Sequence, residues 1–318
     1  MMRTDSSRRA GESPNSASLW DTPMDIRQYL KEKKMLVDGW LSDCLPAPEQ
    51  YSEKLFEAMR YSLLAGGKRL RPILMLATAE LFSDGQDPLL KNFACAIECI
   101  HTYSLIHDDL PAMDDDDLRR GRPTCHIQFS EDIAILAGDA LLTLAFELMS
   151  RPLSSERAPL QIRALNEIAT RAGCLGMVGG QTADVISENG AGEEELVNFI
   201  HTRKTAALIS APIIAGAILA GATDRELRGM SEFGRRIGLA FQIIDDLLEI
   251  HSDAATLGKS VDSDLRNEKI TYPGVFGEDK ARSVAHKEVG EAFSYLGPYG
   301  DRASALAGIA RFFLDRVN

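Results

Sequence analysis

Cysteine is scarce in this chain, and its spacing excludes two kinds of stabilising site. The 318 residues include only Cys44, Cys95, Cys99, Cys125 and Cys174. An odd number of cysteines without a Cys-x-x-Cys pair is not typical of a disulfide framework or a structural zinc site. Cys95 and Cys99 lie one helical turn apart among apolar residues, so we interpret them as small buried hydrophobes.

An excess of positive charge is also missing. The formal net charge is −12 and the sequence pI is about 5.1. An acidic chain is a poor ligand for nucleic acid or for anionic membrane surfaces, so neither is expected as a partner. Any anionic substrate must therefore be held by local cations or by bound metal.

The chain shows neither a secretory signal nor a membrane anchor. Residues 1–18 are rich in Ser and Arg and have no apolar core, which predicts a disordered tail and a cytoplasmic protein. The stretch from Ala206 to Ala222 is uncharged but shorter than the ~20 residues that span a bilayer. We expect no stable membrane insertion and interpret this stretch as a helix buried inside a bundle.

Strand signals are nearly absent, whereas helical periodicity extends along most of the chain. Short connections containing Gly and Pro separate the periodic segments, and no linker divides them. The sequence therefore predicts an all-α protein of ten or so helices, with one domain over residues 19–318. The expected helical segments include 55–64, 73–81, 93–107, 133–148, 196–200, 237–250 and 303–317.

The most unusual segment follows a long apolar stretch. Six aspartates lie between Asp108 and Asp117, and carboxylates this close repel one another unless a cation offsets their charge. Most charge runs are solvated loops, and a calcium loop would need an alternation and a central glycine that are missing here. Mg²⁺ is the third interpretation, because it prefers oxygen ligands and leaves positions open for phosphate. The adjacent Arg119, Arg120 and Arg122 favour it, since guanidinium groups bind phosphate.

A second acidic cluster repeats this layout. Asp245 and Asp246 end an apolar segment, and Glu249 shares the helical face of Asp245. Taken alone, the cluster is explained equally well by acids at the exposed end of a helix. Two such clusters, each with cations nearby (Lys259 and Lys269 here), instead predict opposing helices that hold one diphosphate through several Mg²⁺ ions.

These segments resemble the trans-isoprenyl diphosphate synthases, most closely the bacterial farnesyl diphosphate synthase type, over roughly residues 51–273. The resemblance rests on motifs that follow one another in the order of the family. They are Gly66-Gly67-Lys68-Arg69-Leu70-Arg71-Pro72, Asp108 to Asp114 with Arg119-Arg120-Gly121-Arg122-Pro123-Thr124, Gly179-Gly180-Gln181 with Asp184, Lys204-Thr205, Phe241-Gln242-Ile243-Ile244-Asp245-Asp246, Gly258-Lys259, Lys269 and Thr271-Tyr272-Pro273.

The resemblance implies a ring of antiparallel helices around a deep central cavity, usually in a homodimer, acting on isoprenoid diphosphates. It implies that Mg²⁺, three ions per site with Mn²⁺ as a substitute, is bound by Asp108, Asp109, Asp114, Asp245, Asp246 and Glu249. The allylic substrate would contact Arg119, Lys204, Thr205, Gln242, Lys259 and Lys269, and isopentenyl diphosphate would contact Gly67, Lys68, Arg71, His101 and Arg120. The expected catalytic residues are Asp108, Asp109, Asp114, Arg119, Lys204, Asp245 and Lys259.

One position departs from the pattern of the family. The second motif usually ends in aspartate, and Glu249 stands there instead. Glutamate keeps the negative charge but reaches farther, so the metal affinity at this position is expected to differ.

The implied reaction starts when the allylic carbon–oxygen bond breaks. Metal ions and cationic side chains stabilise the leaving diphosphate, and apolar walls keep water from the carbocation. The released diphosphate is the base that the resemblance implies. His101 and His107 are bases by residue type, but a lone helical histidine is more often a hydrogen-bonded structural residue, which we favour for His107.

Tyr103 is the residue that we expect to set product length. It precedes Asp108 by five residues, which places it about 7.5 Å deeper along a helix. The resemblance implies that a bulky aromatic side chain here ends growth at farnesyl diphosphate, whereas smaller side chains accompany geranylgeranyl diphosphate. Tyr103 is also interpretable as a core aromatic residue, and geranylgeranyl diphosphate is the alternative product.

A metal-dependent phosphohydrolase is the alternative from another class, because His107-Asp108 resembles an HD dipeptide. Such enzymes need further histidine ligands, and the six histidines of this chain show no His-x-x-x-His spacing. A terpene cyclase would leave the Gly66–Arg71 segment without a second diphosphate to bind. A non-enzymatic subunit would be expected to lose acids from one cluster, and both clusters are largely intact.

Overall fold

The computed structural model describes residues 24–83, 87–152, 154–187, 194–251 and 270–316, and it confirms the all-α class. Among these residues, strand structure is limited to an antiparallel hairpin of β1 (Leu118–Arg119) and β2 (Arg122–Pro123). The predicted disordered tail, residues 1–18, lies outside the described residues.

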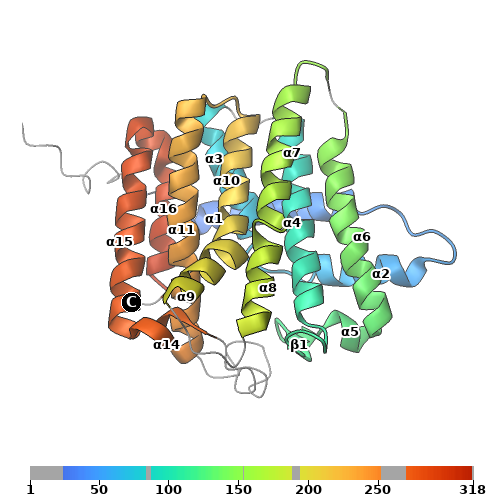
Figure 1. Cartoon of the computed structure of the whole chain (residues 1–318). Coiled ribbons are helices and arrows are strands. Elements are labelled where there is room, and N and C mark those ends of the chain that lie inside the picture. The colour runs from blue at the N-terminus through green and yellow to red at the C-terminus, as the bar shows by residue number, and fades with distance from the viewer. Residues whose placement is uncertain (1–23, 84–86, 153, 188–193, 252–269, 317–318) are drawn as a thin grey trace, which may run out of the picture.

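The helices stand side by side, and most of them run up or down in the view of Figure 1. Their bounds are α1 Ile26–Cys44, α2 Glu53–Leu63, α3 Leu70–Phe82, α4 Pro88–Asp108, α5 Cys125–Gln128, α6 Glu131–Ser150, α7 Ala158–Ala172, α8 Met177–Ser187, α9 Glu194–Ile200, the π-helix η2 His201–Ala206, α10 Ala207–Leu219, α11 Asp224–His251, α14 Tyr272–Phe276, α15 Glu278–Leu296, the 3₁₀-helix η3 Gly297–Ala303 and α16 Ser304–Leu314.

Helix α10 is the centre of the core, as its lack of charge predicts. Every one of its residues is buried, and it packs against α3, α7 and α11. Gly216 brings α10 close to α3, because a β-carbon at this position would lie 3.2 Å from the carbonyl carbon of Met75. A side chain there would force the two helices apart.

Two helical stretches among the described residues are long and apolar enough to cross a membrane, Glu131–Ser150 and Glu194–Leu219. Length and composition alone do not separate such helices from those of a protein core. In the most hydrophobic 18-residue segment of the second stretch, 78% of the residues are buried inside the structure, as expected for a core helix.

The second stretch is also where the structure differs from the sequence-based segments. The sequence predicts separate helices before and after Lys204, but α9, η2 and α10 follow one another without a break. The π-helical turn lies in the middle of this stretch, and such turns often accompany functional sites. It carries Lys204 and Thr205.

The aspartate-bearing ends of α4 and α11 lie at the same end of the molecule, the lower end in Figure 1. Asp87 begins α4 by accepting a hydrogen bond from the backbone nitrogen of Leu89, and Pro88 suits the first turn. From there α4 runs to Asp108, where the first acidic cluster begins. Helix α8 and η2 lie between the ends of α4 and α11 and complete the site.

Candidate active site

Two adjoining cavities form the site. The apolar cavity has a volume of about 700 Å³ and lies between α4, α6, α8 and η2. The polar cavity is smaller, about 200 Å³, and its lining includes both acidic clusters. Leu105, Asp108, Lys204 and Thr205 line both cavities, so the two meet at the end of α4.

The first acidic cluster divides between the polar cavity and the protein interior. Asp108 and Asp114 line the polar cavity, and the backbone nitrogen of Asp114 donates to the carbonyl of Asp108 at 2.8 Å. Burial raises the pKa of Asp108 from its ordinary 3.8 to about 6. Asp109 is buried, and both of its carboxylate oxygens accept from Nε of Arg119, at 2.6 and 2.9 Å. Asp109 therefore holds Arg119 at the wall of the polar cavity.

The second acidic cluster also divides, because its two aspartates, both expected to bind metal, have different partners. Asp246 lines the polar cavity, is buried, and accepts hydrogen bonds from Gln242, His201 and the backbone of Tyr272 at 2.6–2.8 Å. Asp245 instead accepts from Arg316 at 2.7 Å, and burial raises its pKa. Arg316 and His201 are partners that no sequence motif indicated, because both contacts join distant parts of the chain.

Lys204 enters the site from the π-helical turn. It forms an ion pair with Asp184 of α8, and both side chains line the polar cavity. Gln181 of the same helix donates to Asp108 at 3.0 Å. Gln181 and Asp184 belong to a motif whose residues had no separate predicted roles, and they connect α8 to the acidic end of α4 and to Lys204.

Gly180 permits this close fit of α8 against η2. A β-carbon at Gly180 would lie 2.7 Å from Cα of Lys204 and 2.8 Å from the carbonyl carbon of Arg203. We expect Gly180→Ala to push η2 away and to lower the free energy of unfolding by about 1–3 kcal/mol. Urea denaturation measures the change. Gly290→Ala is the control, because a β-carbon there meets nothing within 4 Å; equal effects of the two substitutions would contradict the predicted crowding.

The residues expected to bind a second diphosphate gather around the Gly66-Gly67 turn. Both glycines have positive φ, +85° and +115°, a region that glycine adopts without strain. Arg120 donates to the carbonyl of Gly66 and lies against Gly67. Lys68 lies on the other side of the turn and lines a separate cavity of about 500 Å³ together with Arg316.

Arg71 and His101 line the apolar cavity close to the Gly66-Gly67 turn. Burial lowers the pKa of Arg71 to about 10, and burial beside Arg71 lowers the pKa of His101 well below its ordinary value. Nε of Arg71 is buried without a hydrogen-bond partner among the described residues. A buried guanidinium nitrogen without a partner is costly, and an anionic ligand would satisfy it.

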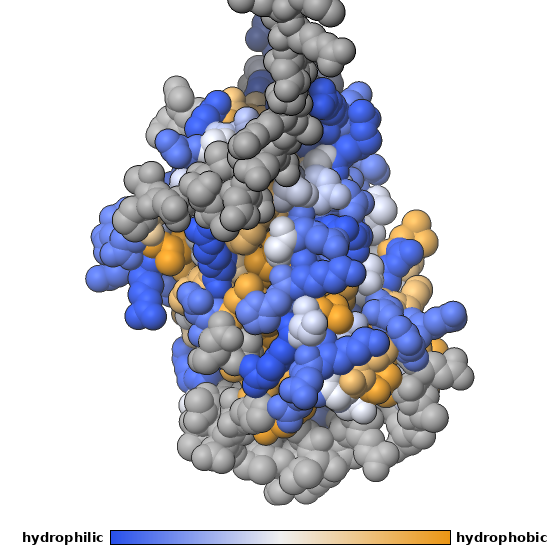
Figure 2. Space-filling model, turned by 90° about the vertical axis from the view of Figure 1, so that its left-hand side faces the viewer, coloured by the Kyte–Doolittle hydropathy of each residue, from blue (hydrophilic) through white to orange (hydrophobic). Residues whose placement is uncertain are grey.

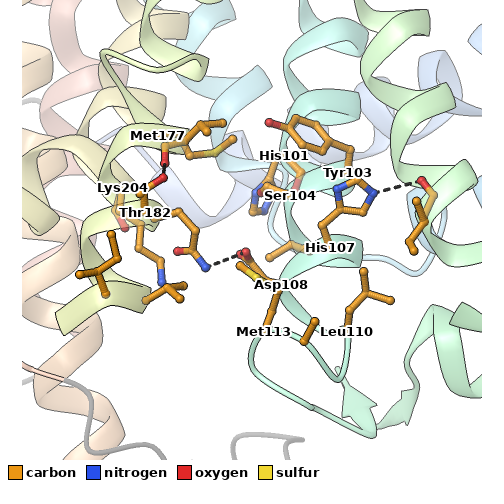
Figure 3. Close-up of a pocket in the computed structure, with 18 of the residues that line it drawn as sticks. His101, Tyr103, Ser104, His107, Asp108, Leu110, Met113, Met177, Thr182 and Lys204 are labelled. Atoms are coloured by element: carbon orange, nitrogen blue, oxygen red, sulfur yellow. Dashed lines mark hydrogen bonds between the residues drawn. The ribbon is translucent and has the colours of Figure 1, made fainter. Parts of the chain in front are cut away.

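Tyr103 lies at the far end of the apolar cavity from Asp108. Figure 3 shows its ring above Asp108, opposite Met177 of α8. It is 8% exposed, so it is at once a packed aromatic residue and part of the cavity wall. Lys259 and Lys269 lie outside the described residues, and the side chain of Glu249 is likewise outside them.

The polar cavity suits Mg²⁺ rather than a metal held by protein alone. Asp108, Asp114, Asp184 and Asp246 supply carboxylate oxygens to its lining. Among the described residues, no three acidic, histidine or cysteine side chains converge closely enough to hold a metal ion. Mg²⁺ is typically bound by one or two carboxylates and completed by water and substrate phosphate, so these donors fit it.

Comparisons with known proteins agree with this geometry. The profile of a family described as polyprenyl synthetase matches residues 52–295. A geranylgeranyl diphosphate synthase of Cyanophora paradoxa is 43% identical over 298 residues, covering 93% of this chain and 98% of that protein.

Two solved structures are similar over nearly their whole length. The FPP/GFPP synthase of Zymomonas mobilis has a TM-score of 0.81 and 36% identity, covering 91% of this chain and 99% of its own. A geranyltransferase of Helicobacter pylori, complexed with magnesium and isoprenyl diphosphate, has a TM-score of 0.81 and 31% identity, covering 93% and 99%.

Proposed function

This chain belongs to the polyprenyl synthetase family, and we propose that it joins isopentenyl diphosphate to dimethylallyl or geranyl diphosphate. One observation carries the proposal: a cavity lined by carboxylates and cations opens, at Asp108, into an apolar cavity. The first suits a diphosphate held through metal, and the second suits a hydrocarbon chain.

Mg²⁺ is the cofactor that these residues would hold, three ions in the full site with Mn²⁺ as a substitute. Among the described residues, Asp108, Asp114 and Asp246 are the candidate Mg²⁺ ligands, because they line the polar cavity. Asp245 would also bind a metal ion if that ion displaced Arg316 from its carboxylate. When bound, the metal ions offset the negative charge that develops on the leaving diphosphate.

The chain's own residues would perform the remaining tasks. Lys204 and Arg119 donate to the diphosphate oxygens as the allylic carbon–oxygen bond breaks and its electron pair leaves with the diphosphate. The apolar cavity keeps water from the allylic cation. Arg71 and Arg120 hold isopentenyl diphosphate so that its double bond attacks the cation. The proton then lost from isopentenyl passes to the released diphosphate.

Geranylgeranyl diphosphate is the better-supported final product, because the Cyanophora relative is named for it. Farnesyl diphosphate, the product expected from the sequence, is the second candidate. It is favoured by the position of Tyr103 at the end of the apolar cavity and by the name of the Zymomonas relative. Farnesyl diphosphate offered as the primer separates the two: the first product requires its elongation, and the second requires that it is left unchanged.

Tyr103→Ala should lengthen the product whichever of the two it is. Removing the ring opens the end of the apolar cavity. A change of this size in an apolar pocket alters the discrimination between a shorter and a longer hydrocarbon chain by about tenfold. We therefore expect the ratio of the next longer product to the wild-type product to rise about tenfold, as measured by chromatography. The control is Tyr51→Ala, because Tyr51 is 97% exposed. Unchanged product length in Tyr103→Ala would show that Tyr103 does not limit the growth of the prenyl chain.

The activity itself is tested by product analysis with isopentenyl diphosphate and each primer, with and without Mg²⁺. A longer prenyl diphosphate formed only with Mg²⁺ supports the proposal. Release of phosphate without chain elongation would favour the phosphohydrolase alternative.

A homodimer in the cytoplasm is the assembly that we propose. Large hydrophobic side chains that do not line the apolar cavity are exposed on α6 and α7, namely Leu136, Phe146 and Ile162. The face beside α15, shown in Figure 2, is mostly hydrophilic by contrast. An exposed apolar surface of this kind marks a site of protein association. Sedimentation of the full chain as a monomer would contradict this assembly.

A further inference from the structure

A space in helix α6 receives a side chain from α4. At Gly138 a β-carbon would lie 2.5 Å from Cδ2 and 2.9 Å from Cε1 of His107. We call the space where a side chain at Gly138 would sit the Gly138 notch. Any larger residue there would occupy the same space as the His107 ring.

His107 is fixed in the Gly138 notch by a hydrogen bond as well as by its shape. Its Nε2 donates to the carbonyl of Ile135 at 3.1 Å, and the Asp139 carboxylate lies 4.0 Å away. Figure 3 shows the ring turned toward α6, with this hydrogen bond drawn as a dashed line. Both His107 and Ile135 line the apolar cavity.

The His107 ring also contacts Tyr103. The two residues are one helical turn apart on α4, and helical side chains lean toward the preceding turn. Their ring centroids are 5.8 Å apart with an interplanar angle of 80°, an edge-to-face arrangement. The His107 ring, seated beside α6, therefore packs against the Tyr103 ring.

We propose that His107 is a positioning residue for product length: seated in the Gly138 notch, it holds the Tyr103 ring at the end of the apolar cavity. This inference rests on the proposed function, because it concerns how long the prenyl chain grows. His107 and Gly138 then determine specificity without either of them taking part in bond breaking.

The two residues should have opposite effects when changed singly. His107→Ala empties the space beside Tyr103 and lets its ring rotate away, so the ratio of longer to shorter product rises, by about tenfold. Gly138→Ala pushes the His107 ring out of the Gly138 notch and into the cavity, so the same ratio falls by a similar factor. Gly229→Ala, where a β-carbon meets nothing within 4 Å, is the control and leaves the ratio unchanged.

The double variant His107→Ala/Gly138→Ala gives the sharpest test. Without the His107 ring, the new methyl group has room, so the substitution at Gly138 should have no further effect on thermal stability or product ratio beyond that of His107→Ala. Such non-additivity is the signature of direct contact. It also keeps the test decisive if Gly138→Ala alone fails to fold.

The outcomes separate this inference from the proposed function. If the wild-type chain forms no prenyl product, the proposed function fails. If it forms product but His107→Ala keeps the wild-type length distribution, or Gly138→Ala is equally harmful with and without His107, the positioning role is overturned. A product shift in His107→Ala that is absent when Tyr103 is already alanine supports the route through Tyr103.

Discussion

Replacing Asp108 by asparagine should lower kcat by about 10³-fold and at the same time stabilise the metal-free protein at neutral pH. The loss of rate follows because Asp108 lies where the polar and apolar cavities meet, and metal stabilisation of a leaving group contributes several kcal/mol. Steady-state kinetics with saturating Mg²⁺ measure it. Retention of more than a tenth of wild-type kcat would exclude Asp108 as a metal ligand.

The gain in stability follows from the raised pKa of Asp108. Because the folded pKa of about 6 lies above the ordinary 3.8, this carboxyl favours folding most below pH 4. That contribution disappears as the pH rises through 6. Above pH 7 the ionised group is a cost that asparagine avoids. Since the residue borders a cavity that admits water, we expect a gain of about 1–2 kcal/mol at pH 7.5 and none at pH 3.5.

Arg69→Met should lower the free energy of unfolding by about 3 kcal/mol, because it leaves a buried acid without its partner. Arg69 is 3% exposed and donates to Glu98, Asp38 and the carbonyl of Leu63 at 2.8–2.9 Å. Arg69 directly follows Gly67 and Lys68 in the chain, and its φ of +53° is in the left-handed region. Urea denaturation measures the loss, and the Km for isopentenyl diphosphate should rise as the Gly66-Gly67 turn loosens.

Lys34→Met is the matched control for Arg69→Met. Lys34 also pairs with Asp38, but the two side chains are 39% and 35% exposed, so this pair contributes less than about 1 kcal/mol. Arg69→Met/Glu98→Gln should recover part of the stability, since a neutral amide costs less to bury than a carboxylate. Equal losses in Arg69→Met and Lys34→Met would contradict the importance of burial.

The sequence predicted the first half of the site more completely than the second. Asp108, Asp114, Arg119 and Lys204 belong to local motifs, and the structure brings all four to the polar cavity. The same motifs also assigned Asp109 to the metal, whereas in the structure its carboxylate is turned inward onto Arg119. Adjacent residues on a helix end point in different directions, so a pair of aspartates does not reveal which one faces the cavity.

Asp245 and Asp246 likewise show that the sequence does not reveal which of two adjacent aspartates faces the cavity. The sequence placed both among the metal ligands and only Asp245 among the catalytic residues, yet Asp246 lines the polar cavity and Asp245 pairs with Arg316. The partner lies in the last residues of the chain, where no pattern marks it. The contact between Asp245 and Arg316 depends on how the C-terminal segment packs, and that packing is decided only by the fold.

By itself, the sequence determined the all-α class, the burial of α10 and the family. Helical periodicity, the lack of charge in α10 and the order of the motifs can all be read along the chain. The tertiary structure alone decided the depth of the apolar cavity and the contacts of its wall. Tyr103, His107 and Gly138 come from two helices, and their spacing depends on how closely α4 and α6 pack. Packing distances arise from many side chains acting together, so no single segment contains them.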